Sequence, residues 1–192
     1  MWLLSLLQEI LQYNEHFVTN HTYQQFETSK FPDKKLVVIS CMDTRLTELL
    51  PQAMNLNNGD AKFVKIAGAI VGHPFGSVMR SVMVSIYELG AQEVCVIGHY
   101  GCGMENIDPD RTIERMIDRG VALETFDTLA GGGINLRDWL TGFPDVRDNV
   151  IQSVQRIKRH PLMPPTIPVH GLVIDPETGK LDVVVNGYEN GA

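Results

Sequence analysis

Cysteine and positive charge are both scarce in this sequence. Its three cysteines, Cys41, Cys95 and Cys102, are an odd number at wide spacings, whereas secreted disulfide scaffolds carry dense sets of paired cysteines. We therefore expect reduced thiols and a cytoplasmic protein. The formal net charge is −7, and nucleic-acid phosphates select basic surfaces. This acidic balance argues against a nucleic-acid-binding function.

Long apolar runs are also missing. No segment approaches eighteen uninterrupted apolar residues, so we expect no membrane span and no membrane partner. The apolar N-terminus has no basic start, since the first lysine is Lys30, and Gln8 and Glu9 interrupt its hydrophobic stretch. A secretory signal peptide needs both a basic start and an apolar core. We therefore expect a structural segment here and not a signal peptide.

Apolar residues in this segment recur at the spacing of one helix face. They are Leu3, Leu4, Leu7, Ile10 and Leu11. Residues 1–30 are therefore predicted to form a helical arm with a wide apolar stripe. Such a stripe has to be buried, either on the same domain or on a partner subunit.

Five segments rich in β-branched and apolar residues are bounded by turn residues, which predicts strands. They span residues 35–40, 61–67, 93–99, 167–175 and 180–187. Helical patterns lie between them, at 47–55, 76–90 and 146–160. Strands that alternate with helices and are almost continuously apolar predict an α/β fold. We expect a central, mostly parallel β-sheet flanked by helices.

The last two strands are joined differently. The residues between them contain Asp-Pro and Thr-Gly, which favour a tight turn. A C-terminal antiparallel hairpin at the edge of the sheet follows. We expect one domain over residues 1–192.

Residues 104–145 are the least regular part of the chain and are rich in Asp, Arg and Gly. Three consecutive glycines at 131–133 suggest a phosphate loop, but they do not follow a strand and lack the Lys-Ser/Thr of that motif. We interpret them as a flexible turn between short helices. The function of this segment stays open.

The first polar cluster follows the first strand, in the stretch Ile-Ser-Cys-Met-Asp-Thr-Arg at 39–45. Alternation with period two places Cys41, Asp43 and Arg45 on one side of an extended segment. These residues form either a functional site or only the polar end of a buried strand. In the second case, Asp43 and Arg45 form a salt bridge that anchors the loop and has no chemical role.

The second cluster follows the third strand, where His99 and Cys102 are separated by two residues. Two ligands across a short turn can approach one metal ion. In open parallel sheets, ligands bind outside the carboxyl ends of strands, so Cys41 joins this pair if strands one and three are neighbours. Two thiolates and one imidazole leave a tetrahedral zinc ion with an open position, which is the catalytic pattern.

The remaining cysteine and histidines have simpler interpretations. Cys95 lies inside an apolar strand and is predicted to be a core residue. His73 follows the second strand and is a candidate for a supporting or proton-relay role at the same crevice. Structural roles are predicted for the other four, His16, His21, His160 and His170.

The combination Cys-x-Asp-x-Arg and His-x-x-Cys resembles the signature of the β-class carbonic anhydrases. The stretch 36–104, with "GDAKFVKIAGAIV" and "SIYELGAQEVCVIGHYGCGM", is similar to the compact prokaryotic branch of that family. The chain departs from the family at Ile66, where Asn is common, and the segment 121–145 has no counterpart that we can place. The glutamine that helps to bind substrate in plant-type members is not assigned.

The resemblance implies one zinc ion per subunit, held by Cys41, His99 and Cys102. It makes Asp43 and Arg45 the paired residues of the active site, with Asp43 either hydrogen-bonded to the zinc-bound water or itself the fourth zinc ligand. It also implies a homodimer or a larger assembly of dimers, in which the N-terminal helix reaches over the partner subunit.

The implied activity is the reversible hydration of carbon dioxide to bicarbonate and a proton by zinc-bound hydroxide. In this interpretation Arg45 holds Asp43 off the metal through a bidentate pair, and Asp43 orients the hydroxide. Two alternatives remain. One is a hydrolase of carbon disulfide or carbonyl sulfide on the same fold, and the other is a non-catalytic zinc-binding scaffold with a closed site.

Overall fold

The computed structural model describes residues 5–189, and Leu3 and Leu4 of the predicted apolar stripe lie outside this range. The chain divides into two compact units, with the boundary between Lys30 and Phe31. Within residues 5–189, no helix has both the length and the apolar character needed to cross a membrane.

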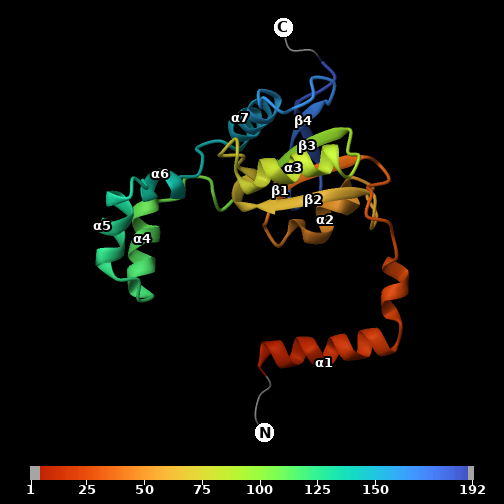
Figure 1. Ribbon diagram of the computed structural model, residues 1–192, viewed down its shortest axis with the longest axis horizontal. Helices are drawn as coiled ribbons and strands as arrows, with labels where there is room; N and C mark the ends of the chain where they lie inside the picture. Colours follow the sequence, from red (N-terminus) through yellow and green to blue (C-terminus); the bar gives the residue numbers. More distant parts are fainter. Residues whose placement is uncertain (1–4, 190–192) are drawn as a thin grey trace. The chain divides into compact units, whose positions relative to one another are not determined.

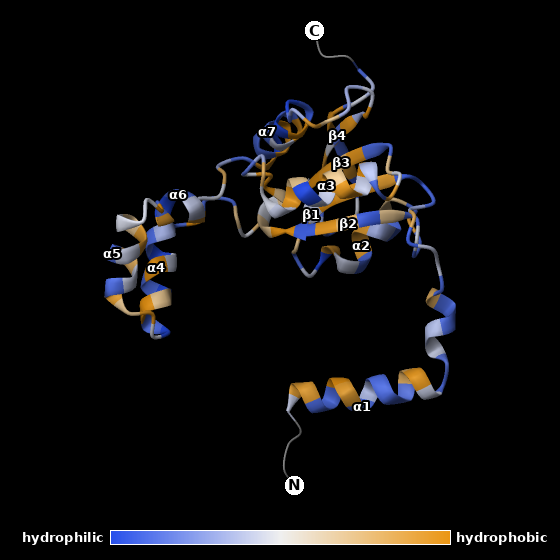
Figure 2. Ribbon diagram, in the orientation of Figure 1, coloured by the Kyte–Doolittle hydropathy of each residue, from blue (hydrophilic) through white to orange (hydrophobic). Residues whose placement is uncertain are grey.

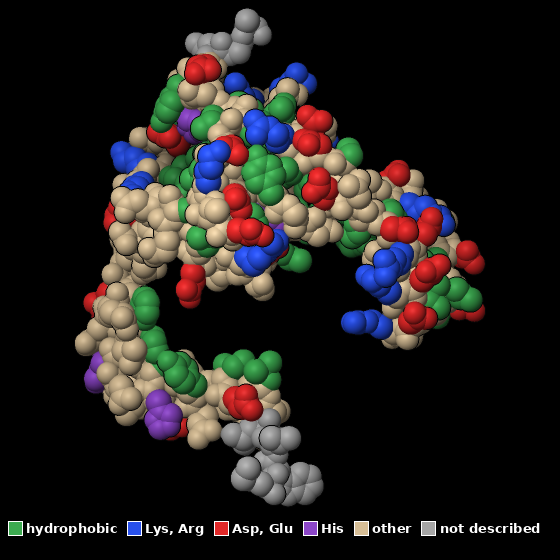
Figure 3. All heavy atoms as spheres, turned by 180° about the vertical axis from the view of Figure 1, so that it is seen from behind, with side chains coloured by type: hydrophobic (Ala, Val, Ile, Leu, Met, Phe, Trp, Pro, Cys, Tyr) green, Lys and Arg blue, Asp and Glu red, His purple; other side chains and the backbone are tan. Residues whose placement is uncertain are grey.

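The first unit contains helix α1 (Leu6–Thr19) and the 3-10 helix η1 (Thr22–Phe26). Ser5 and Gln8 cap the start of α1 reciprocally, which satisfies backbone N–H groups that a helix start leaves open. No residue of α1 is buried, and apolar side chains gather along one side of it (Figures 2 and 3). A helix of this length is marginal in water without tertiary packing, so the stripe requires a covering surface.

The second unit is built on one five-stranded sheet (Figure 1). Its strands are β1 (Leu36–Cys41), β2 (Ala61–Ile66), β3 (Glu93–His99), β4 (Val169–Ile174) and β5 (Leu181–Val185). The spatial order is β2-β1-β3-β4-β5, and every pairing is parallel except that of β5 with β4. The predicted fold class and the C-terminal hairpin are confirmed, and the first and third strands are neighbours, which meets the condition for Cys41 to join His99 and Cys102.

The central strands are buried because they carry apolar residues on both faces. Val37, Val38 and Ile39 of β1 and Val94 and Val96 of β3 have no exposed surface. Strands of a parallel sheet that is covered by helices have this continuous apolar pattern. The core therefore holds the carboxyl ends of β1 and β3 firmly side by side.

Helices α2 (Leu46–Ala53), α3 (Ser77–Tyr87) and α7 (Val146–Lys158) flank this sheet. Helix α7 contacts β3, β4 and β5, and α3 contacts β2. The approach of α7 is close, because a Cβ atom at Gly98 would lie 2.7 Å from Val146 and 2.9 Å from Val150. Glycine at the residue before His99 therefore lets the helix pack against the strand.

Residues 104–145 form three short helices, α4 (Pro109–Asp118), α5 (Leu123–Gly131) and α6 (Leu136–Leu140). Helix α6 contacts both of the others. The triple glycine ends α5, as predicted for a turn between short helices. Backbone hydrogen bonds join Phe143 to Met104 and Asn106 at the base of this insertion, directly beyond Cys102.

Candidate metal centre

The order in which strands are added to the sheet reverses between β1 and β3. From β1 the chain crosses to β2 on one side and then returns to β3 on the other side. Such a switch point opens a crevice at the carboxyl ends of the two strands. Cys41 ends β1 and His99 ends β3, so the topology brings both predicted clusters to one place.

Cys41, His99 and Cys102 form a compact group of potential ligands. One ligand atom from each lies within 4.8 Å of the others, and the Sγ atoms of Cys41 and Cys102 are 3.8 Å apart. All three side chains are buried. Among residues 5–189, this is the group of three His, Cys, Asp or Glu residues that could hold a metal ion.

The His99 ring has one satisfied and one unsatisfied nitrogen. Its Nδ1–H donates to the backbone oxygen of Tyr100 at 3.0 Å, because a carbonyl oxygen can only accept. In the neutral ring the Nε2 atom then carries the lone pair, and it is buried without a hydrogen-bond partner among the described residues. A buried acceptor beside two thiols is costly unless something binds it. This arrangement fits a zinc ion, which takes thiolate and imidazole ligands.

The two thiols of the group have different affinities for their protons. Burial raises the pKa of Cys41, but the contact with His99 and the backbone N–H groups of Asp43 and Gly68 outweigh it and lower this pKa to about 7. Burial also raises the pKa of Cys102, here to about 11, and the neighbouring Cys41 adds to the rise. The first proton therefore leaves Cys41, and the resulting charge holds the second proton on Cys102.

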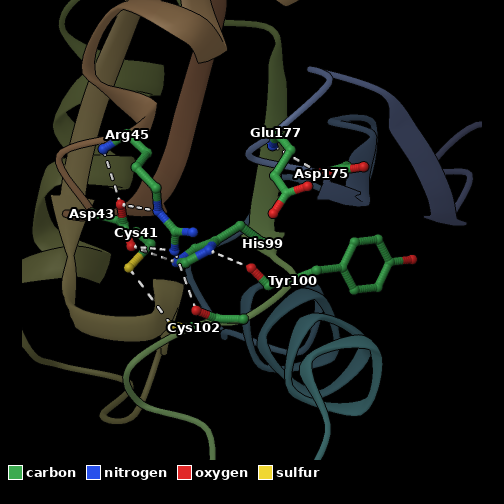
Figure 4. A network of polar contacts seen from close by, with 9 residues as sticks. Cys41, Asp43, Arg45, His99, Tyr100, Cys102, Asp175 and Glu177 are labelled. Carbon is green, nitrogen blue, oxygen red and sulfur yellow. Dashed lines mark hydrogen bonds and ion pairs between the residues drawn. The ribbon is translucent and has the colours of Figure 1, made fainter.

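Asp43 and Arg45 form a bidentate pair beside this group (Figure 4). The Nε and Nη2 atoms of Arg45 donate to the two oxygens of Asp43 at 3.0 and 2.9 Å. Arg45 is fixed further by a hydrogen bond from Nη2 to the backbone oxygen of Gly101 at 3.2 Å. The Arg45 guanidinium lowers the pKa of Asp43 to about 2, so Asp43 is a carboxylate at any physiological pH.

The Asp43 carboxylate also faces the metal-binding group. Its Oδ2 atom lies 3.7 Å from Nε2 of His99. The predicted convergence of Cys41, Asp43, Arg45, His99 and Cys102 is thus present in the structure. The chemical roles of these residues remain predictions.

A cavity of about 550 Å³ opens onto the two cysteines of this group, and His99 lies behind them, outside the lining. The cavity is lined by the two cysteines of the group, by Asp43 and Arg45, and by small or apolar residues from two loops: Ala67, Gly68, Gly103 and Met104. Gly68 also lines the cavity, although the sequence did not mark it as a site residue. Its φ is +63, and a Cβ atom at this position would lie within 3.1 Å of three side chains. No sequence signal marks that position, because the crowding involves residues about 35 and 75 positions away.

Two other predicted residues lie outside this cavity. His73 is exposed, and its Nδ1 atom accepts a hydrogen bond from the backbone N–H of Phe75 at 3.1 Å. It is not among the residues that line the cavity, so the structure does not bring it to the metal-binding group. Ile66 is also absent from the lining, and its backbone oxygen accepts from Met42 at 3.0 Å.

The remaining cysteine and histidines have local partners. Cys95 is a buried thiol in β3, and burial raises its pKa to about 12. His160 packs against Phe75 with 5.1 Å between ring centroids. His170 lies 3.4 Å from Glu93, and the exposed His21 lies 3.2 Å from the Tyr23 hydroxyl. The core role of Cys95 agrees with its prediction.

Comparison with known proteins gives one consistent result. A sequence profile with the description "Carbonic anhydrase" matches residues 36–181. The chain is 58% identical over 183 residues to "Putative carbonic anhydrase YvdA" of Bacillus subtilis (strain 168), covering 95% of this chain and 93% of that protein. It is 27% identical over 157 residues to "Carbon disulfide hydrolase" of Acidithiobacillus thiooxidans, covering 78% and 76% of the two chains.

A solved structure is similar over almost the whole chain. It is the β-carbonic anhydrase isoform I of Trichomonas vaginalis, with a TM-score of 0.86 and 33% sequence identity. The match covers 96% of this chain and 100% of that one. The range matched by the sequence profile spans the segment 121–145.

Proposed function

The chain belongs to the β-carbonic anhydrase family, and from this premise we propose that it catalyses the reversible hydration of carbon dioxide to bicarbonate and a proton. One zinc ion per subunit is held by Cys41, His99 and Cys102 in this proposal. The observation that carries it is the unpartnered, buried Nε2 of His99 beside two thiols at the floor of a cavity.

The metal supplies the chemistry that the side chains lack. When bound, zinc lowers the pKa of a coordinated water so that hydroxide is available near neutral pH. Cys41 and Cys102 formally cancel the charge of the metal when both are thiolates, which weakens its Lewis acidity relative to a site of three histidines. We therefore expect more activity above neutral pH than below it.

Asp43 orients the nucleophile. Its Oδ1 atom accepts two hydrogen bonds from Arg45, through the backbone N and Nε. Its Oδ2 atom accepts one, from Nη2, and is the oxygen that lies 3.7 Å from His99 Nε2. With zinc bound, Oδ2 would have a free lone pair to accept a hydrogen bond from the oxygen that the metal activates, and Asp43 would in this way orient the nucleophile.

Arg45 keeps that carboxylate available. A carboxylate this close to a zinc ion is drawn onto the metal, where it fills the position that the substrate water needs. The bidentate pair and the additional bond to Gly101 hold Asp43 away. In this proposal the Asp43–Arg45 pair controls access to the fourth zinc position. The site is inactive, or closed, when Asp43 itself binds the metal.

The related hydrolase of carbon disulfide is the first alternative. The sequence identity to that protein is 27%, compared with 58% to the Bacillus carbonic anhydrase homologue. This difference favours carbon dioxide as the substrate. A non-catalytic zinc scaffold is the second alternative, and it requires Asp43 to stay on the metal. The Arg45 pair opposes this arrangement.

The assembly and the location of the protein complete the proposal. The uncovered apolar stripe of α1 supports a homodimer, or a larger assembly of dimers, in which the arm of residues 1–30 packs on the partner subunit. The second unit and the arm together form one domain in this view. Three free cysteines support a cytoplasmic location.

Parallel assays test the proposed function. Protein with a measured zinc content is supplied with carbon dioxide, carbonyl sulfide and carbon disulfide in separate reactions. Carbon dioxide is expected to be the best substrate by kcat/KM. Preferential turnover of a sulfur analogue would favour the hydrolase, and no turnover of any of the three by zinc-loaded protein would favour the scaffold.

A further inference from the structure

Tyr100 follows His99 in the chain and fixes the state of its ring. The bond from His99 Nδ1–H to the Tyr100 backbone oxygen, at 3.0 Å, selects the tautomer in which Nε2 can bind a metal. The direction of that carbonyl depends on the Tyr100 peptide unit. Whatever holds Tyr100 in place therefore also orients His99.

The backbone of Tyr100 is held by the neighbouring strand. Its N–H donates to the backbone oxygen of Ile174, the last residue of β4, at 3.1 Å. The next residue, Gly101, has φ +63, which lets the chain turn sharply toward Cys102. The Gly101 oxygen accepts from Arg45, so the loop between the two proposed ligands is fixed on both sides.

The side chain of Tyr100 points away from Cys41 and Asp43 (Figure 4) and is held by two other elements. Its hydroxyl donates to Oδ2 of Asp182 in β5 at 2.9 Å. Arg147 in α7 donates to the same hydroxyl oxygen at 3.3 Å. Asp182 is held in turn by Lys180, whose Nζ lies 2.9 Å from Oδ1.

These contacts connect the edge strand to the metal-binding group through two hydrogen bonds at opposite ends of Tyr100. The connection runs from Asp182 to the Tyr100 hydroxyl, and from the Tyr100 carbonyl to the His99 ring. None of Tyr100, Asp182 and Arg147 is among the residues that line the cavity. Their effect on a substrate in that cavity is therefore indirect, through the Tyr100 backbone and its hydrogen bond with His99.

We propose that Tyr100 is a positioning residue for His99, and that Asp182 and Arg147 lock it so that Nε2 is presented to the metal. This inference rests on the proposed metal site. Hydrogen bonds to the second nitrogen of a ligating histidine fix its tautomer and orientation, and losing such a partner commonly costs ~10–100-fold in metal affinity.

Two substitutions remove the lock without removing volume. Tyr100→Phe deletes only the hydroxyl, and Asp182→Asn replaces its charged acceptor. Tyr87→Phe is the matched control, because the Tyr87 hydroxyl also donates a hydrogen bond, to the backbone oxygen of Leu162 at 2.8 Å, from an exposed position on helix α3. Asp110→Asn, which breaks the exposed ion pair with Arg137, is the control for the second change.

Zinc affinity of the full-length protein is measured by competition with a chromophoric chelator. Both variants are expected to bind zinc about tenfold more weakly than wild type, and both controls are expected to bind it unchanged. The absorption spectrum of the cobalt-substituted protein is expected to shift in the two variants only. Arg147→Met, which removes the weaker contact, provides a third variant if Asp182→Asn does not fold.

The tautomer gives a readout that does not depend on zinc. In metal-free wild type, at a pH where the ring is neutral, the ¹⁵N shifts of the His99 ring are expected to show a single Nδ1–H form, and in Tyr100→Phe a mixture of the two tautomers. Unchanged zinc affinity and tautomer in Tyr100→Phe would overturn the positioning role, even if its stability fell. Wild-type protein that bound no zinc would instead overturn the proposed function and, with it, the link from Tyr100 to metal binding.

Discussion

Arg45 donates three hydrogen bonds to the carboxylate of Asp43. Its backbone N and Nε donate to Oδ1 at 2.9 and 3.0 Å, and Nη2 donates to Oδ2 at 2.9 Å. A lysine cannot reproduce this planar, two-pronged contact. The position of the carboxylate beside the metal-binding group therefore depends on one particular side chain.

Arg45→Ala is expected to close the site. Without its partner, Asp43 moves onto the zinc ion and fills the position that the substrate water needs. We expect zinc to be retained and kcat/KM for carbon dioxide to fall by at least about 10²-fold, the usual cost of losing a preorganised polar group. Stopped-flow hydration and X-ray absorption at the zinc edge measure the two effects.

The matched control for this change is Arg137→Ala, which removes an exposed ion pair of the same type, with Asp110 at 2.6 Å. It is expected to leave the rate unchanged. Full hydration activity in zinc-loaded Arg45→Ala would show that Arg45 is not needed to keep Asp43 off the metal.

Cys41→Ser is expected to abolish stoichiometric zinc binding. The substitution replaces a thiolate ligand by a hydroxyl that does not ionise at neutral pH, so the loss should exceed the ~10–100-fold that removal of an outer partner costs. Zinc content after dialysis, measured by mass spectrometry, reports the result. Cys95→Ala, at a buried thiol in the same sheet, should keep its zinc, and retained zinc in Cys41→Ser would refute the ligand assignment.

The three thiols are expected to react in a set order in metal-free protein. The pKa of Cys41 is lowered to about 7, whereas those of Cys102 and Cys95 are raised to about 11 and about 12. Thiolates are the reactive form, so raising the pH through 7 should switch on labelling of Cys41 by iodoacetamide first. Peptide mapping identifies the modified residue.

Zinc supplies the control for that order, because a metal-bound thiolate is shielded from the reagent. Added zinc should slow labelling of Cys41 strongly. Equal labelling rates for Cys95 and Cys41, or no protection by zinc, would contradict the assignment.

Gly68→Ala is expected to destabilise the fold at the wall of the cavity. The new Cβ atom would lie 2.9 Å from the Phe143 ring and 3.0 Å from Met104, at a residue with φ +63. Strain of this kind costs about 1–3 kcal/mol in the free energy of unfolding, which urea denaturation measures. Gly103→Ala also changes the cavity wall but has nothing within 4 Å of its Cβ position, and a loss as large in that variant would argue against the crowding.

Much of the fold could be predicted from local patterns. The strands are β-branched and apolar, and parallel strands bring their carboxyl ends to one edge, so Cys41 and His99 meet on the condition that the first and third strands are neighbours. The alternation of Cys41, Asp43 and Arg45 likewise predicted a pair on one face. The alternation has a period of two, which the sequence expresses directly, whereas the strand order comes from the structure.

Other features depend on contacts between distant residues. The role inferred for Tyr100 depends on Asp182 in the antiparallel strand β5, and no local pattern gives the register of that strand. His73 was a candidate for the crevice because it follows β2. The η2 turn (Ala67–Ala69) lies between them, and His73 is exposed beyond this turn, outside the cavity lining. The crowding at Gly68 has the same origin.

Carbon dioxide hydration measured by stopped flow from pH 7 to 9, on protein of known zinc content, tests the central claim most directly. Asp43, with its pKa lowered to about 2, stays ionised throughout this range, so a change in rate cannot come from its titration. We predict activity that is proportional to bound zinc and rises with pH. Zinc-loaded protein that is inactive at every pH in this range would contradict the account.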